Sequence, residues 1–201
     1  MDQAWNKLIK CLDQITDDFK EFNYDLHPGV TDKKILSLEN IIRKQFPDDF
    51  KAFYKIHNGE NAHGYGIMKG EEFLSMERIL EEWTVWKELL ENNSFIDDED
   101  DAFVSNPDSG IKNDWWNLNW IPFTYDGSGN HICIDLNPSE EGNYGQIIRV
   151  WHDDSVRELL ANSFTEWIQE YISQLENNEY LYSEDYGVLV HKSDLEDWEE
   201  E

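Results

Sequence analysis

Apolar side chains recur every three or four residues in five stretches of the chain, and this spacing predicts five amphipathic helices. The stretches cover residues 5–19, 35–42, 50–57, 79–90 and 164–175. Thr31 and Ser163 each precede such a stretch and are side chains of the kind that cap helix N-termini. Pro47 suits the first turn of the third helix. Gly59 is expected to end that helix, because glycine accepts the left-handed backbone conformation that follows helices.

Alternating apolar and polar residues predict a β-hairpin in the second half of the chain. Its strands are residues 123–126 and 131–136, and the tetrad 127–130 between them tolerates the positive φ angles of tight turns. Asp126 is expected to cap the turn through its own side chain. The second strand divides its residues between two faces, with Ile132, Ile134 and Leu136 on one and His131, Cys133 and Asp135 on the other.

Three further strands are predicted around residues 65–68, 72–74 and 146–151. Together the elements predict an α+β fold with a single mixed, largely antiparallel sheet flanked by helices. Six large side chains are expected to be buried in it: Phe50, Tyr54, Trp120, Ile132, Ile134 and Trp167.

Two segments interrupt this pattern. Residues 92–114 are polar and acidic, and we interpret them as an exposed, mobile loop. The tail at residues 176–201 is acidic but also rich in apolar residues, which predicts short strands at 180–182 and 188–190 and a last helical turn from Ser193. It is either an appendage docked on the core or an arm that contacts a partner. The chain is therefore divided into a domain at residues 1–175 and an acidic C-terminal extension at residues 176–201.

The net charge of the chain limits which partners it can bind. The chain has 201 residues and a formal net charge of −28, of which −26 falls after residue 51. Nucleic acid and anionic membrane surfaces should repel such a protein, whereas a basic protein partner would be attracted to it. The acidity serves either solubility or docking to a cationic partner, and composition does not decide between them.

Targeting and redox features are sparse. Cys11 and Cys133 do not form a disulfide framework, and a reducing compartment is the simplest context for them. The N-terminal residues lack the basic and apolar regions of a signal peptide, and no apolar run approaches the length of a membrane span. We therefore expect a cytoplasmic protein.

No combination of residues predicts a catalytic centre, a metal site or a cofactor site. His131, Cys133 and Asp135 share one strand face, but three alternating residues on one strand seldom converge on one ion. A catalytic cysteine also needs an oriented base and an oxyanion site, and no motif for either is present. The acidic run at residues 97–101 lacks the alternating ligands and central glycine of an EF-hand loop. Packing and solvation are the expected roles of these residues.

A cluster of tryptophans lies next to this acidic run. Trp120 is expected to belong to the core. Trp115 and Trp116 either cover the edge of the sheet or form an aromatic anchor surrounded by carboxylates, since tryptophan is enriched at interface hot spots. The predicted partner-binding residues are Asp97, Asp98, Glu99, Asp100, Asp101, Trp115 and Trp116.

The order of the motifs resembles a known family. Pro28-Gly29, Pro47-Asp48-Asp49-Phe50 ending in Asn58-Gly59, Trp120-Ile121-Pro122, Asp126–Asn130 with Cys133-Ile134-Asp135, and Phe164–Trp167 follow one another along the chain. This order is similar to that of the SUKH superfamily, in the branch of the fungal Smi/Knr cell-wall-assembly regulators, across about residues 5 to 175.

The resemblance implies an α+β fold without a catalytic centre. For bacterial members it implies an immunity protein, or antitoxin, that binds and neutralises a cognate polymorphic toxin. The acidity suggests a cationic, nuclease-type toxin as the partner, since proteins that bind nucleic acid are basic where they meet phosphate. A regulatory scaffold or adaptor of the cell-wall-assembly type is the alternative, although the short single-domain length favours the immunity protein.

Overall fold

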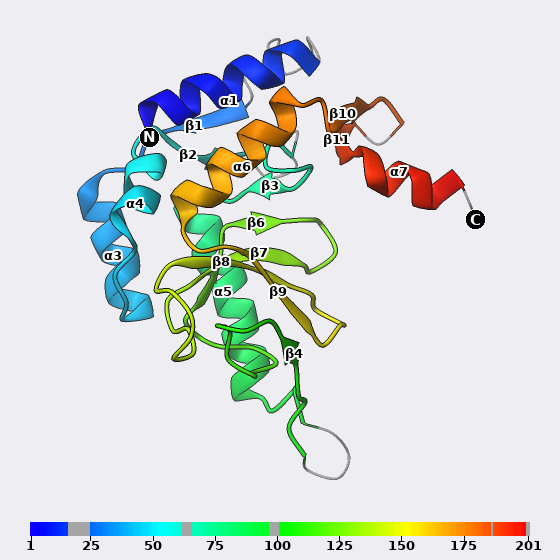
Figure 1. Cartoon of the computed structure of the whole chain (residues 1–201). Coiled ribbons are helices and arrows are strands. Elements are labelled where there is room, and N and C mark those ends of the chain that lie inside the picture. Colours follow the sequence, from blue (N-terminus) through cyan, green and yellow to red (C-terminus); the bar gives the residue numbers. More distant parts are fainter. Residues whose placement is uncertain (16–24, 62–65, 97–100, 186, 200–201) are drawn as a thin grey trace.

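A five-stranded mixed sheet forms the centre of the computed structural model, which describes residues 1–15, 25–61, 66–96, 101–185 and 187–199 (Figure 1). The strand order is β4-β9-β8-β7-β5, and only the β4–β9 pairing is parallel. The predicted α+β fold with a mixed, largely antiparallel sheet is therefore confirmed. The bounds are β4 Asn106–Pro107, β5 Trp120–Pro122, β7 His131–Asp135, β8 Gln146–Val150 and β9 Val156–Ala161.

In the described part of the chain, three antiparallel two-stranded sheets accompany the central one. β1 (Leu26–Pro28) pairs with β2 (His57–Glu60), and β3 (Glu72–Phe73) pairs with β6 (Thr124–Tyr125). β10 (Tyr180–Ser183) pairs with β11 (Val188–His191) in the C-terminal tail. The predicted hairpin is present, but β5 is the strand that pairs with β7, and the backbone hydrogen bonds from Phe123 to Ile132 and from Asp126 to Asn130 continue it to the turn. The Asp126 carboxylate accepts hydrogen bonds from the backbone N–H groups of its turn, as the sequence suggested.

Helices cover both faces of the central sheet. In Figure 1, α6 (Phe164–Glu176) and α1 (Asp2–Ile15) lie on one side of the sheet and α5 (Met76–Glu91) lies on the other. α3 (Asp32–Ile42) and α4 (Asp48–Tyr54) lie at one edge, and α7 (Lys192–Glu199) follows the tail hairpin. Thr31 and Ser163 accept the N-terminal hydrogen bonds of α3 and α6, as predicted.

The alternation along β7 places its residues in two separate hydrophobic clusters. Ile132 and Ile134 belong to the main core between the sheet and α1, α4 and α6. Cys133 faces a second cluster with Trp86 of α5, Trp116 and Trp120. All six side chains predicted to be buried are buried, because the sheet is covered on both faces.

Long-range packing corrects the predicted end of the third helix. α4 ends at Tyr54, and residues 57–60 form strand β2 instead of another helical turn. Gly59 has a φ of +77°, and an added Cβ would lie 2.4 Å from the backbone nitrogen of Ser75. This glycine therefore permits a close approach between two chain segments, a role that local helix signals do not reveal.

The predicted loop at residues 92–114 is only partly exposed. Its residues 106–107 pair in parallel with β9, and Ser105 and Ile111 are buried. The predicted strand at residues 65–68 is absent from the described part, where Met68 makes only an isolated bridge to Glu71. The tail contains the two strands and the helix that were predicted, and Tyr180 and Leu189 join the main core. Among the described residues, every helix is too short or too polar to cross a membrane.

Candidate partner-binding site

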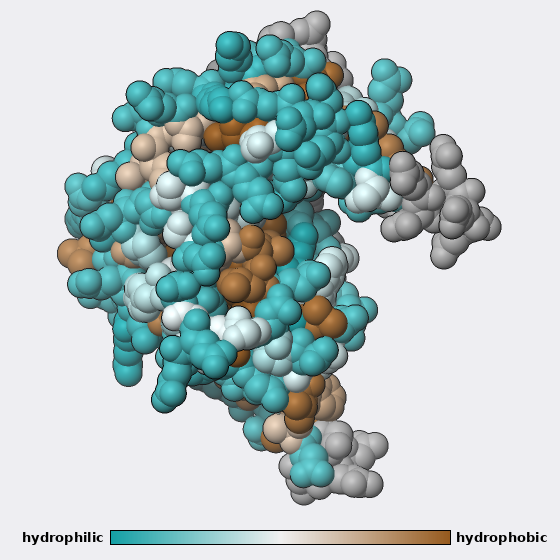
Figure 2. All heavy atoms as spheres, viewed as in Figure 1, coloured by the Kyte–Doolittle hydropathy of each residue, from teal (hydrophilic) through white to brown (hydrophobic). Residues whose placement is uncertain are grey.

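Large apolar side chains are exposed near the end of α5 and in the segment that follows it. Ile96, Phe103 and Val104 are exposed, and Val104 retains 66% of its accessible surface. We call these three residues, together with the half-buried Trp115, the loop patch. Figure 2 shows hydrophobic atoms gathered at this lower end of the molecule. Contiguous exposed apolar surface on a folded protein is typical of a binding site.

Backbone pairing builds the base of the loop patch. The Ser94 N–H donates to the Leu89 carbonyl at 3.0 Å where α5 ends. The Phe103 N–H then donates to the Phe95 carbonyl at 2.9 Å, and Ile96 forms a bridge with Ala102. The two flanks of the acidic run are therefore joined to each other.

The acidic residues predicted to bind a partner divide at the limit of the described structure. Asp97, Asp98, Glu99 and Asp100 lie outside the described residues. Asp101 is described and is exposed. Glu88 and Glu91, in the last turns of α5, add exposed carboxylates that the sequence analysis did not single out. The loop patch therefore combines apolar side chains with nearby negative charge.

Trp115 is held in place by an arginine and a phenylalanine. The Arg157 guanidinium lies 5.1 Å from the Trp115 ring centroid, and its Nη2 donates to the Trp115 carbonyl at 2.8 Å. Phe103 packs edge-to-face on Trp115, with 5.2 Å between the ring centroids. Burial lowers the pKa of Arg157 to about 10, so the guanidinium remains charged at neutral pH. Trp115 therefore has a fixed orientation and a partly open face.

Trp116 has a different role from its neighbour. Only 3% of its surface is exposed, and it stacks on Trp86 of α5 with 4.4 Å between ring centroids. The expectation that both tryptophans reach a partner thus needs correction, because Trp116 lies beneath the surface. It supports the loop patch from below, while Trp115 is the tryptophan of the pair that remains available for contact.

A cleft of about 270 Å³ lies within this region. The side chains around it are mostly apolar, with two asparagines and one aspartate among them. It is large enough for one bulky side chain of a partner. Its lining comprises Leu90, Asn93, Phe95, Ile96, Ala102, Phe103, Asn113, Asp114, Trp115 and Trp116.

His131, Cys133 and Asp135 of β7 lie in three different environments. His131 Nδ1 lies 2.8 Å from the Thr124 carbonyl oxygen, and burial lowers the pKa of this imidazole to about 4. Asp135 accepts hydrogen bonds from Gln146 Nε2 and from the Asn137 N–H. Cys133 is fully buried among apolar side chains, and burial raises the pKa of its thiol. Within the described ranges, no three histidine, cysteine or acidic side chains group together in a way that could hold a metal ion.

Two buried carboxyl groups escaped the sequence analysis. Glu71 pairs with Arg149 at 2.5 Å and accepts from the Thr124 hydroxyl. Glu60 is fully buried and accepts from the Gly66 and Ile67 N–H groups at 2.9 and 3.3 Å. Burial raises the pKa of Glu60 to about 8. Both residues sit in short polar segments, and nothing in the local sequence distinguishes them from exposed acids.

Comparison with known proteins agrees with this fold. Residues 29–170 match the family model described as SMI1 / KNR4 family (SUKH-1). The chain is 26% identical to the cell wall biosynthesis/cell cycle regulator smi1 of Schizosaccharomyces pombe, over 93% of this chain and 38% of that protein. It is 25% identical to the cell wall assembly regulator SMI1 of Saccharomyces cerevisiae, over 85% of this chain and 41% of that protein.

A bacterial relative matches over most of both chains. The SPbeta prophage-derived uncharacterized protein YokK of Bacillus subtilis is 27% identical, over 88% of this chain and 92% of that protein. By contrast, the chain spans well under half the length of the fungal relatives described above.

Proposed function

Because the chain belongs to the SMI1 / KNR4 (SUKH-1) family, we propose that it is an immunity protein that binds and neutralises a cognate polymorphic toxin. The toxin is a basic, nuclease-type protein, and neutralisation requires binding without catalysis. The loop patch is the contact surface. The observation that carries this proposal is the exposed apolar group Ile96, Phe103 and Val104 beside the acidic run.

The two components of the surface contribute different physical effects. Burying Phe103, Val104 and the open face of Trp115 removes apolar area from water, which slows dissociation of the complex. The carboxylates attract a cationic partner and accelerate its association. The carboxylates would thus form ion pairs with the cationic side chains that the toxin uses to bind phosphate.

The chemistry of the described side chains supports binding over catalysis. His131, Cys133 and Asp135 are buried and held by separate neighbours, so they present no reactive group to a substrate. The fungal relatives are named as regulators. The prophage origin of the bacterial relative is consistent with a role in conflict between bacteria, the setting in which immunity proteins act.

Binding kinetics with the purified toxin domain encoded beside the gene test this proposal. Replacing Phe103→Ser and Val104→Ser should mainly accelerate dissociation, with a loss of binding free energy on the order of 2 kcal/mol. Ile41→Ser is a control, because the exposure of Ile41 is comparable to that of Phe103 but Ile41 lies on α3. If the double variant and the control bind as the unmodified chain does, the loop patch is not the contact surface.

A regulatory scaffold of the cell-wall-assembly type is the second candidate. The names of the fungal relatives favour it, since these proteins align with 85% and more of the chain. The two functions differ in their consequence for the partner. A scaffold leaves its partner active, whereas an immunity protein abolishes the partner's activity at equimolar concentration.

A further inference from the structure

A second group of exposed apolar side chains lies around α3, away from the loop patch. Leu36 and Tyr144 retain 56% and 51% of their surface. Figure 2 shows hydrophobic atoms at the left edge of the molecule, over the position of α3 in Figure 1. We call these residues, together with Arg43 and Lys44, the α3 patch. It uses none of the residues assigned to toxin binding, so it stands independently of the proposed function.

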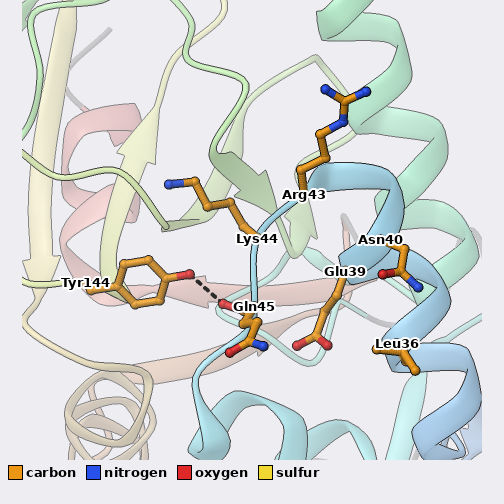
Figure 3. Close-up of a pocket in the computed structure, with 7 residues that line it drawn as sticks. All are labelled: Leu36, Glu39, Asn40, Arg43, Lys44, Gln45 and Tyr144. Atoms are coloured by element: carbon orange, nitrogen blue, oxygen red, sulfur yellow. Dashed lines mark hydrogen bonds between the residues drawn. The ribbon is translucent and has the colours of Figure 1, made fainter.

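A pocket of about 450 Å³ forms part of the α3 patch (Figure 3). Leu36, Glu39 and Asn40 come from the helix, while residues 43–45 come from the turn that follows it. Tyr144 faces them from the loop before β8, and its hydroxyl donates to the Gln45 carbonyl at 2.6 Å. The hydrogen bond joins the two walls, so the pocket is a fixed feature of the fold.

The α3 patch is cationic in a strongly acidic protein. Within the described part of the chain, no carboxylate lies within salt-bridge distance of Arg43 or Lys44. Lys34, Lys55 and Arg78, by comparison, all pair with acids. Glu39 lines the same pocket, but one of its oxygens accepts from the Phe46 N–H at 2.8 Å. The patch therefore presents two available positive charges beside apolar surface.

We propose that the α3 patch binds the acidic C-terminal segment, residues 192–201, of a second copy of this chain. That segment contains six carboxylates and one lysine. It also contains Leu195 and Trp198, which are three residues apart, as in an apolar helix face. Its apolar residues are complementary to Leu36 and Tyr144, and its carboxylates are complementary to Arg43 and Lys44. Charge complementarity selects this occupant over a basic one.

The position of the segment requires that the contact form between two molecules. α7 follows β11 directly and extends away from the body on the side opposite α3 (Figure 1). Its own α3 patch is therefore out of reach. A reciprocal exchange between two copies gives a closed dimer, whereas a one-way contact gives longer oligomers whose size increases with concentration.

Sedimentation velocity of the full chain tests the proposal. The unmodified protein should self-associate at about 0.05 M salt and dissociate at about 0.5 M salt, because screening weakens exposed charge pairs. Arg43→Gln with Lys44→Gln should weaken self-association about tenfold, as expected for the loss of two exposed ion pairs. The control is Lys7→Gln with Lys10→Gln, which removes the same charge from α1. This control should associate normally.

A charge-reversal pair provides the second test. The variant Arg43→Glu with Lys44→Glu should be monomeric, and so should Asp194→Lys with Asp197→Lys. An equimolar mixture of the two should form a heterodimer. The lysine-substituted tail of one variant then meets the glutamate-substituted patch of the other, and the unmodified tail meets the unmodified patch. Circular dichroism confirms that each variant is folded. An unmodified protein that stays monomeric at every concentration, or a mixture that does not associate, would overturn the proposal.

Discussion

The indole rings of Trp86 and Trp116 stack face to face, with centroids 4.4 Å apart and an interplanar angle of 14°. Trp86 belongs to α5, and Trp116 lies in the segment that leads into β5. Their contact fixes that segment against the helix and leaves Trp115 at the surface. The stack is therefore the structural support on which the loop patch depends.

Replacing Trp116→Ala should destabilise the fold strongly. The side chain is buried in the second cluster, so its removal leaves a cavity that costs about 3–5 kcal/mol. Trp115→Ala should cost much less, because that ring is half-exposed. Urea unfolding of the two variants measures the difference. Similar losses for both would contradict the assignment of one support and one surface residue.

Neutralising the acids near the loop patch should slow binding of a basic partner. The variant combines Glu88→Gln, Glu91→Gln and Asp101→Asn, which are exposed positions. The association rate should fall and depend less on salt, while dissociation changes little, because peripheral charges act mainly on encounter. The control combines Glu170→Gln, Glu184→Gln and Asp185→Asn at the far end of the molecule. An equal loss with both sets would indicate a net-charge effect without a defined surface.

Glu60 should make the protein less stable as pH rises. Burial raises its pKa from 4.5 to about 8, so the folded state holds a proton that the unfolded chain releases. The stabilisation is complete below pH 4.5 and is lost as pH rises toward about 8. Glu60→Gln should flatten this decline. Urea unfolding should be compared above pH 6.5, the ordinary pKa of the imidazole, because His131 titrates below it. An unchanged slope in the variant would show that another group is responsible.

Replacing Cys133→Ser should leave partner binding unchanged. The thiol is buried in the second cluster and lies away from solvent. A hydroxyl without a partner at this position should cost about 1–3 kcal/mol of stability. Thermal unfolding and binding kinetics on the same sample separate the two effects. Metal-dependent turnover that this substitution abolishes would contradict the proposal of a binder without catalysis.

Local signals in the sequence predicted the features that neighbouring residues determine. The caps at Thr31 and Ser163, the turn held by Asp126 and the alternation of β7 depend on residues within a few positions of one another. The tail strands were predicted for the same reason. These interactions persist in most tertiary contexts, which is why they can be read from a single sequence.

Long-range contacts account for what the sequence did not predict. Gly59 looked like a helix end, but its conformation serves a close approach to the segment around Ser75. Trp115 and Trp116 are adjacent and outside any regular element, so no periodicity tells which one is buried. Trp116 is the buried one because it stacks on Trp86, which lies 30 positions earlier in the chain. Apolar residues on both sides of the acidic run were visible in the sequence, and they are the signal that could have located the loop patch.

Titration of the toxin's activity with this protein is the most direct test of the proposed function. The purified toxin domain encoded beside the gene is assayed on its own substrate with increasing amounts of the full chain. We predict complete inhibition at an equimolar ratio, and a clear shift to higher concentration for the Phe103→Ser, Val104→Ser variant. Toxin that stays fully active with a large excess of the unmodified protein would contradict the assignment as an immunity protein.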